Sequence, residues 1–203
     1  METLLVIFYS YFSGSIPFGF IFTKITINKD VRKIGSGNIG ATNVLRTGNK
    51  SLAAITLILD ITKGFVPVLV SKMYFPELVQ ISALLAFLGH VFPVWLKFKG
   101  GKGVATYLGI LLSFSYGLGA LFIFTWIIVS LIFNYSSLSS MFSSLAVFII
   151  TFLRENFVQG IDPNFTYGTN IQLLLFIFFI LIIFTHRKNI NNLKNKKEKK
   201  IKI

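Results

Sequence analysis

Long, nearly unbroken apolar blocks are the feature that most constrains how this chain folds. Two of them, residues 118–133 and 173–184, contain no charged side chain. Crossing the hydrocarbon core of a bilayer takes about 20 mostly apolar residues in a helix. Backbone polar groups in lipid must be paired within the spanning structure, so helices are expected, and alternating strands of the outer-membrane type are absent. With 54% hydrophobic residues, the sequence predicts an all-α integral membrane protein.

The apolar blocks predict seven transmembrane helices. The expected segments are residues 3–27, 51–73, 78–97, 103–118, 119–134, 139–155 and 169–185. One long span in place of the fourth and fifth would put the C-terminal tail on the opposite face from the first loop. We therefore expect one membrane domain over residues 1–188, followed by a basic tail over residues 189–203.

Basic residues orient these segments, because positive charge gathers on the cytoplasmic side of a membrane protein. All 20 Lys and Arg residues except Lys63, Lys72 and Arg154 lie in the segment 24–50, the segment 97–102 or the tail. With seven spans, the segment 24–50, the segment 97–102 and the tail all lie on one side of the membrane, together with the segment 134–138. The N-terminus is then outside and the C-terminus cytoplasmic. The tail itself is expected to be partly disordered and attracted to anionic lipid.

Several classes of chemistry are excluded by composition. The chain has no cysteine, which removes disulfides, thiolate catalysis and cysteine metal sites. Its two histidines and seven acids form no ligand cluster of useful spacing, and no G-x-S-x-G elbow occurs. The net charge of +13 follows from topology rather than from nucleic-acid binding. No metal and no cofactor is expected.

The first inner segment contains a glycine-rich stretch, GSGNIGATNVLR, at residues 35–46. Three glycines in six residues allow positive φ angles, and successive amides can then converge on an anion. A helix beginning just after them would add its positive end. The stretch also brings neutral hydrogen-bonding groups and a guanidinium able to grip phosphate, on Ser36, Asn38, Thr42, Asn43 and Arg46. Together with Gly37 and Gly40, they form a candidate phosphate site.

The second inner segment, KFKGGKGVAT at residues 97–106, is also glycine-rich and basic. It differs from a nucleotide-binding P-loop in spacing and follows no strand, so an ATPase is not indicated. Adjacent glycines still admit an anion closely, and Lys102 adds charge. The candidate residues here are Gly100, Gly101, Lys102 and Gly103. Two such loops in one chain suggest two phosphate groups.

Polar residues inside or beside the apolar blocks are the remaining candidates. Asp60 and Lys63 lie three apart in one span, where an internal ion pair is favoured over catalysis. His90 is more typical of a packed polar residue, although it could bond the second glycine-rich loop. His186 and Asn189 stand at the inner membrane surface at i, i+3 spacing, which places both on one helical face.

Taken together, these motifs resemble the bacterial acyl-phosphate:glycerol-3-phosphate acyltransferases, the PlsY family. The resemblance covers nearly the whole chain and is carried by motifs in order: GSIPFG at 14–19, GSGNIGATNVLR at 35–46, DITKG at 60–64, GHVFP at 89–93, FKGGKGVAT at 98–106 and HRKNI at 186–190. The chain differs from the usual family pattern at Asn134 and Asn192, where arginine is common, and at Lys196, where glycine is common.

The resemblance implies a seven-span enzyme in the bacterial cytoplasmic (inner) membrane, with its active site on the cytoplasmic face. It implies transfer of a fatty acyl group from acyl phosphate to the 1-hydroxyl of glycerol 3-phosphate, giving lysophosphatidic acid for phospholipid synthesis. Ser36, Arg46 and Lys102 would hold phosphate, and His186 and Asn189 would lie beside the reacting hydroxyl. Ser137 would contribute from the third inner segment. The partners are the two substrates and membrane lipid; no partner protein is indicated.

The residues fit that chemistry independently. Acyl phosphate is an activated donor, so the protein needs only to hold two phosphates, orient a hydroxyl and stabilise developing charge. The proton could pass to His186 or to a phosphate oxygen of a substrate. Two other classes are an organophosphate transporter built on broken helices and a membrane scaffold. The first needs paired broken segments around a midplane site, and the second gives the two glycine-rich loops no role.

Overall fold

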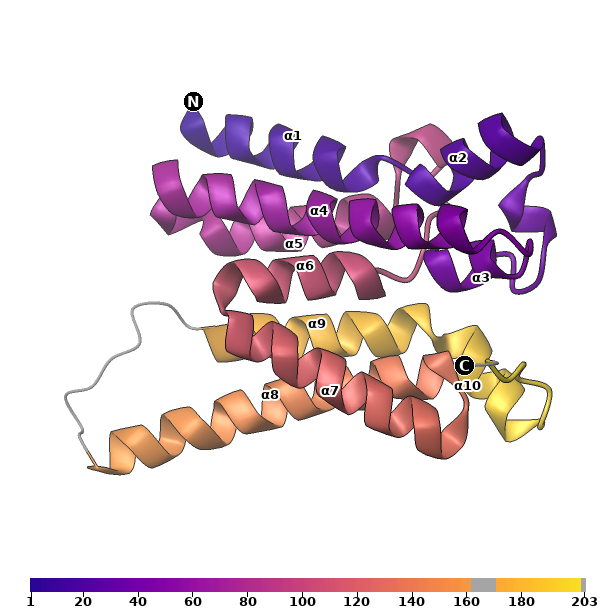
Figure 1. Cartoon of the computed structure of the whole chain (residues 1–203). Helices are drawn as coiled ribbons and strands as arrows, with labels where there is room; N and C mark the ends of the chain where they lie inside the picture. Colours follow the sequence, from indigo (N-terminus) through magenta and orange to yellow (C-terminus); the bar gives the residue numbers. More distant parts are fainter. Residues whose placement is uncertain (162–170, 202–203) are drawn as a thin grey trace. The chain divides into compact units, whose positions relative to one another are not determined.

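The structure, a computed structural model, describes residues 1–161 and 171–201, with side chains omitted over residues 155–161. Helices account for nearly all of it (Figure 1), and no β-strand occurs within those two ranges. The α-helices are α1 Glu2–Ser15, α2 Phe18–Ile27, α3 Ala41–Leu45, α4 Lys50–Tyr74, α5 Val79–Val91, α6 Val104–Phe114, α7 Tyr116–Phe133, α8 Ser136–Ile161, α9 Ile171–Thr185 and α10 Arg187–Lys194. Short 3₁₀ turns are η1 Val31–Lys33, η2 Pro76–Leu78 and η3 Val94–Leu96. The expected all-α class is confirmed.

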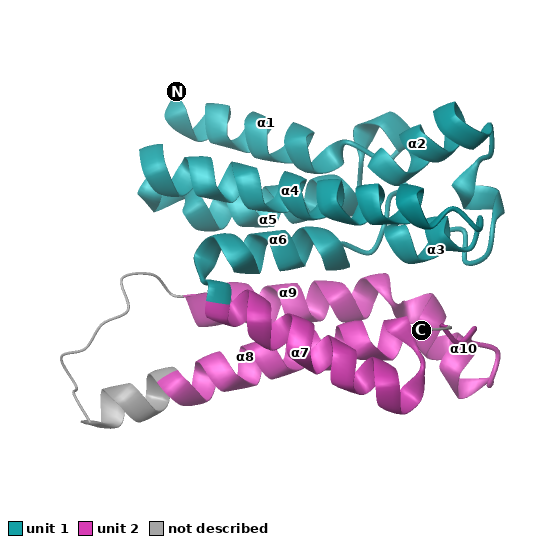
Figure 2. Cartoon of the chain, in the orientation of Figure 1, with its two compact units in different colours: residues 1–116 teal, residues 117–203 magenta. Residues whose placement is uncertain are grey.

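The chain forms two compact units, Met1–Tyr116 and Gly117–Ile203, coloured separately in Figure 2. In the first unit, α4 packs against α1, α5 and α6, and α1 packs against α5. Backbones come close because glycines lie at the crossings. A Cβ on Gly14 or Gly89 would overlap the backbone of the facing helix in the α1–α5 pair, and the same holds for Gly64 and Gly109 between α4 and α6. Such contacts are the usual basis of helix association in lipid.

The second unit is built on the packing of α8 against α9, with the Phe148 and Phe176 ring centroids 5.3 Å apart. Buried serines of α8 pair with the helix itself. The hydroxyls of Ser139 and Ser143 donate to carbonyls four residues earlier, at 3.0 and 2.7 Å. These small side chains therefore add no unpaired polar group to the buried face of the helix.

Within the described residues, five helical stretches are long and apolar enough to cross a membrane, or six if α9 and α10, which meet at a 56° bend, are one span. The chain is thus a multi-pass protein by length and composition. The helix α6 has 11 residues, which at about 1.5 Å per residue is shorter than a bilayer core. The apolar helices agree with the expected multi-pass membrane protein, and the count of seven crossings and their orientation stay a prediction.

Segment boundaries differ from the sequence expectation in several places. The helix α7 begins at Tyr116, where residue 119 was expected, and α8 ends at Ile161, where residue 155 was expected. The first segment is broken at Ile16–Pro17, since a residue before proline is pushed out of the helical region. The helix α8 begins at Ser136, three residues earlier than expected. The expected seventh segment begins at residue 169, and residues 169–170 lie outside the described ranges.

The tail also differs from expectation. Residues 187–194 form the helix α10, so partial disorder from residue 189 is wrong for that stretch. The amide of Ile201 also donates to the carbonyl of Asn134 at 2.9 Å, which ties the tail to the α7–α8 turn.

Candidate functional site

The first glycine-rich loop is organised by one buried side chain, that of Asn43. Its Oδ1 accepts hydrogen bonds from the amide of Ser36 at 2.9 Å and from Nη1 of Arg46 at 3.4 Å. Its Nδ2 donates to three backbone carbonyls at 2.7 to 2.9 Å, those of Val31, Ile34 and Asn38. The sequence predicted Asn43 as a substrate-binding residue. In the structure, its side-chain amide forms hydrogen bonds within the loop.

Three polar side chains of this loop face outward. Ser36, Thr42 and Arg46 are exposed, while Asn43 is 2% exposed. Beneath them lies a cluster of apolar residues that fixes the loop to the end of the first unit: Val31, Ile39, Val44, Leu52, Ala53 and Leu96. The loop therefore presents a hydroxyl and a guanidinium on a rigid base.

The three glycines of this loop differ. Gly35 and Gly37 take φ angles of +54° and +73°, as the sequence predicted. Gly40 does not, because its φ is −77° and it simply precedes α3. Since α3 has five residues, the expected contribution of a helix terminus to anion binding is small.

A second arginine in the same segment is already engaged. Arg32 Nε and Nη2 donate to the two carboxylate oxygens of Asp30 at 3.0 and 2.8 Å, and the guanidinium lies over the Phe20 ring. The hydrogen bond from Arg32 lowers the pKa of Asp30 to about 2. Arg32 thus stabilises the loop, and Arg46 is the loop's stronger candidate for binding phosphate.

The second glycine-rich loop is held by its backbone. The amides of Gly100 and Gly101 donate to the carbonyls of Val91 and His90, each at 3.1 Å. These two amides therefore cap α5, and substrate binding at Gly100 and Gly101 stays a prediction. Lys102, directly after them, is half-buried.

Glycine is required at these positions because of close approach. A Cβ on Gly100 would overlap the His90 carbonyl and Pro93, and a Cβ on Gly101 would overlap the His90 imidazole. Gly103, with φ +82°, precedes α6 and packs against the Phe87 ring. The glycines predicted to bind substrate shape the loop that carries Lys102.

In the second unit, His186 sits at the bend between α9 and α10 and is 2% exposed. Its Nδ1 lies 2.8 Å from the carbonyl of Ile182. A carbonyl can only accept, so Nδ1 carries a proton. In the neutral ring, Nε2 then has the lone pair that a general base needs.

Glu198 is a residue of this region that sequence reasoning missed. Its Oε1 accepts hydrogen bonds from Asn189 Nδ2 and, at 3.0 Å, from Ser137 Oγ. Its Oε2 lies 3.4 Å from Asn192 Nδ2. The carboxylate thus joins Asn189 and Ser137, two predicted site residues. The signal in the sequence was a lone acid within a lysine-rich tail.

The backbone turn before Glu198 has a definite form. After α10, the amide of Lys196 donates to Leu193 O at 3.1 Å and that of Lys197 to Asn192 O at 2.8 Å. This is the Schellman arrangement, in which the residue after the cap is left-handed and usually glycine. Lys196 fills that position with φ +54°. The departure from the family pattern therefore leaves the turn intact.

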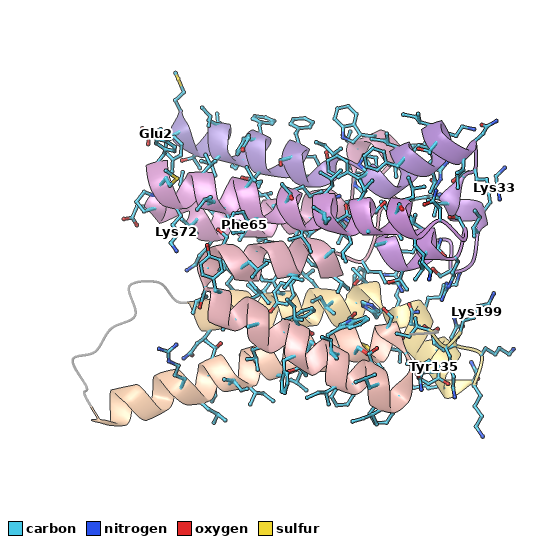
Figure 3. All side chains as sticks on the ribbon, viewed as in Figure 1. Glu2, Lys33, Phe65, Lys72, Tyr135 and Lys199 are labelled. Carbon is cyan, nitrogen blue, oxygen red and sulfur yellow. The ribbon has the colours of Figure 1, made fainter. Side chains whose placement is uncertain are left out.

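The candidate residues are divided between the two units. Figure 3 shows Lys33, from the first loop, at the opposite end of the first unit from Glu2 and Lys72, and Tyr135 and Lys199 at the same end of the second unit. Ser36, Arg46 and Lys102 belong to the first unit, and Ser137, His186 and Asn189 to the second.

Comparison with known proteins assigns the chain to a family. Residues 4–196 match the family model described as glycerol-3-phosphate acyltransferase. A glycerol-3-phosphate acyltransferase of Pelagibacter ubique is 54% identical over 100% of both chains. One from Brucella anthropi is 48% identical over 95% of this chain and 90% of the relative.

A solved structure agrees over the full length. It is PlsY (YgiH), an integral membrane glycerol 3-phosphate acyltransferase in its glycerol 3-phosphate form, with a TM-score of 0.89, 33% identity and coverage of 100% of this chain and 96% of that one. The lysophosphatidic acid form of PlsY matches with a TM-score of 0.86. Motifs, helical membrane fold and relatives all agree: the chain belongs to the glycerol-3-phosphate acyltransferase family, as an integral membrane acyltransferase of the PlsY type.

Proposed function

We propose that this glycerol-3-phosphate acyltransferase uses acyl phosphate as its donor and releases lysophosphatidic acid. The observation that carries the proposal is the pair of exposed groups, Ser36 and Arg46, fixed together by the buried Asn43. A rigid hydroxyl and guanidinium suit a phosphate-bearing substrate. Solved PlsY forms with glycerol 3-phosphate and lysophosphatidic acid support the same acceptor and product here.

Direct transfer follows from what the chain contains. With no cysteine and no serine elbow in its sequence, transfer straight from an activated donor accounts best for the reaction. The choice of acyl phosphate among activated donors rests on the resemblance of the motifs to the acyl-phosphate-dependent family. The 1-hydroxyl oxygen of glycerol 3-phosphate forms a bond to the acyl carbonyl carbon, and the bond from that carbon to the phosphate oxygen breaks. Inorganic phosphate leaves, and no acyl-enzyme forms.

Each site residue has a proposed role. Arg46, Lys102 and Ser36 hold phosphate, with Gly37, Asn38, Gly40 and Thr42 around them and Gly100, Gly101 and Gly103 shaping the second loop. His186 Nε2 takes the hydroxyl proton and passes it to the departing phosphate. Asn189 and Ser137, joined by Glu198, orient the acceptor.

A donor assay tests the central claim. Purified protein with labelled glycerol 3-phosphate is offered acyl phosphate, acyl-coenzyme A or acyl-carrier-protein thioester in separate reactions. Lysophosphatidic acid is expected from acyl phosphate alone, and protein incubated with labelled acyl phosphate stays unlabelled. Equal turnover with a thioester, or stoichiometric acylation of the protein, would refute the proposal.

Site variants separate binding from proton transfer. Arg46→Ala and Lys102→Ala are expected to raise KM, because a charge-assisted hydrogen bond contributes about 1.5–3 kcal/mol in ground and transition states alike. His186→Ala is expected to lower kcat by roughly 10²–10⁴ with little change in KM. If His186→Ala keeps near-normal kcat while the other two are inactive, a substrate phosphate is the base. If all three variants stay active, the assignment of these residues to the active site is wrong.

We also propose that the active site faces the cytoplasm of a bacterial inner membrane. Lys33 and Lys199 are exposed, and the chain has no cysteine. Single variants Lys33→Cys and Lys199→Cys should therefore react with an impermeant thiol reagent only after permeabilisation. Glu77→Cys, between α4 and α5, should react in intact cells. The reverse labelling pattern would show that the protein has the opposite orientation in the membrane.

A further inference from the structure

The middle of α4 holds a buried ion pair that the proposed chemistry does not use. Lys63 Nζ lies 2.7 Å from Asp60 Oδ1, and the two side chains are 3% and 2% exposed. The ion pair expected from the sequence is thus confirmed. Placing charge in a membrane helix is costly, and a buried pair often stabilises no more than apolar residues of equal size. Its contacts with other elements point to another role.

Lys63 reaches the break in the first segment. Its Nζ donates to the carbonyl of Ile16 at 2.6 Å and lies 5.5 Å from the centroid of the Phe18 ring. Ile16 stands between α1 and α2, outside either helix. The ammonium group therefore fixes where α2 begins, and the first glycine-rich loop follows α2 in the chain.

Asp60 faces the second glycine-rich loop through His90. The His90 Nδ1 lies 3.8 Å from Asp60 Oδ1, and the residue is 3% exposed. The imidazole packs directly on Gly101, and the His90 carbonyl accepts the Gly101 amide. A displacement of His90 is thereby transmitted to Gly101, and Lys102 is the next residue.

We propose that Asp60, Lys63 and His90 form a positioning network that sets both glycine-rich loops for phosphate binding. The network connects α4 to the α1–α2 break on one side and to the loop of Lys102 on the other. It touches no substrate and acts through the loops that do. The inference rests on the proposed role of those loops in holding glycerol 3-phosphate.

The decisive variant removes both charges together. Asp60→Leu/Lys63→Met replaces the pair with apolar residues that keep the branching of Asp60 and the unbranched chain of Lys63, and buried pairs often tolerate apolar replacement. The folded variant loses the bond to Ile16 and the carboxylate that lies 3.8 Å from His90 Nδ1. We expect KM for glycerol 3-phosphate to rise on the order of tenfold while kcat changes little, because the loops bind phosphate less well. Hydrogen exchange at Gly100 and Gly101 should become faster.

A network that only stabilises the fold would lower Tm and leave KM and the exchange of the loop amides at wild-type values. That result would overturn the proposal. Asp60→Asn keeps the shape of the side chain and tests the same point if the double variant fails to fold; wild-type KM in this variant would also overturn it. Thr62→Val, on the exposed face of the same helix, is the matched control and should change nothing.

Failure of the underlying function gives a different pattern. If the wild-type protein forms no product from acyl phosphate and glycerol 3-phosphate, the proposed function fails and KM has no meaning. The exchange rates of Gly100 and Gly101 then decide the network alone. Faster exchange in the double variant supports the connection, and unchanged exchange refutes it.

Discussion

The two glycine-rich loops of the first unit look alike in sequence and are built in different ways. The first loop is held by a side chain, since Asn43 bonds five groups around it. The second is held by backbone hydrogen bonds from Gly100 and Gly101 and by rings packed on its glycines. Glycine content alone thus does not tell which atoms a loop offers to an anion. Different substitutions should therefore disrupt the structure of the two loops.

The largest effect is expected from Gly101→Ala. A Cβ there would overlap three atoms of the buried His90 ring, which has no open space to enter. The loop must move away from α5, and Lys102 moves with it. We expect loss of most activity and a clear fall in Tm, measured by product formation and thermal unfolding in detergent. Wild-type behaviour would show that the second loop is not held by this contact.

Asn43→Ala should have the next largest effect. The change leaves carbonyls of the loop and the Ser36 amide without their partner, and each buried unpaired group costs about 1–3 kcal/mol. The Tm should fall by more than it does in Asn38→Ala. The Asn38 side chain accepts a single local hydrogen bond, from the Ile39 amide. Equal losses in both variants would contradict the central role of Asn43.

The sequence predicted the helical class, both loops and the ion pair, because each has a local signature. Long apolar blocks define the helices, and i, i+3 spacing brings Asp60 to Lys63. The role of Asn43 was not predictable, because its five partners depend on how the loop closes. Glu198 was missed for the same reason: its bonds to Ser137 and Asn189 join positions 61 and 9 residues away.

A smaller effect of opposite sign is expected at Lys97. Lys97 has a φ of +53°, a left-handed conformation that costs a non-glycine residue roughly 1 kcal/mol. Lys97→Gly should therefore raise Tm slightly. Lys99→Gly removes the same charge two residues on, at a position without positive φ, and should lower Tm through the entropy of the unfolded chain. A lower Tm in both variants would show that glycine at position 97 does not release backbone strain.

The smallest effect is expected from Gly40→Ala in the first loop. With φ −77° and the nearest atom to a new Cβ being Asn38 Nδ2 at 3.5 Å, alanine fits without strain. Stability should change by less than about 0.5 kcal/mol. Activity is the informative measurement here. A loss of activity at unchanged Tm would mean that Gly40 lies against the substrate, as its motif suggests.

The ion pair of α4 also bears on how the protein enters the membrane. Asp60 and Lys63 are one helical turn apart, so the pair closes as soon as that helix forms. A single buried charge resists insertion by about 2.5–3.5 kcal/mol, whereas a neutralised pair presents much less of that barrier. The pair therefore lowers the cost of placing α4 in a bilayer without any contact from α5 or the loop of Lys102.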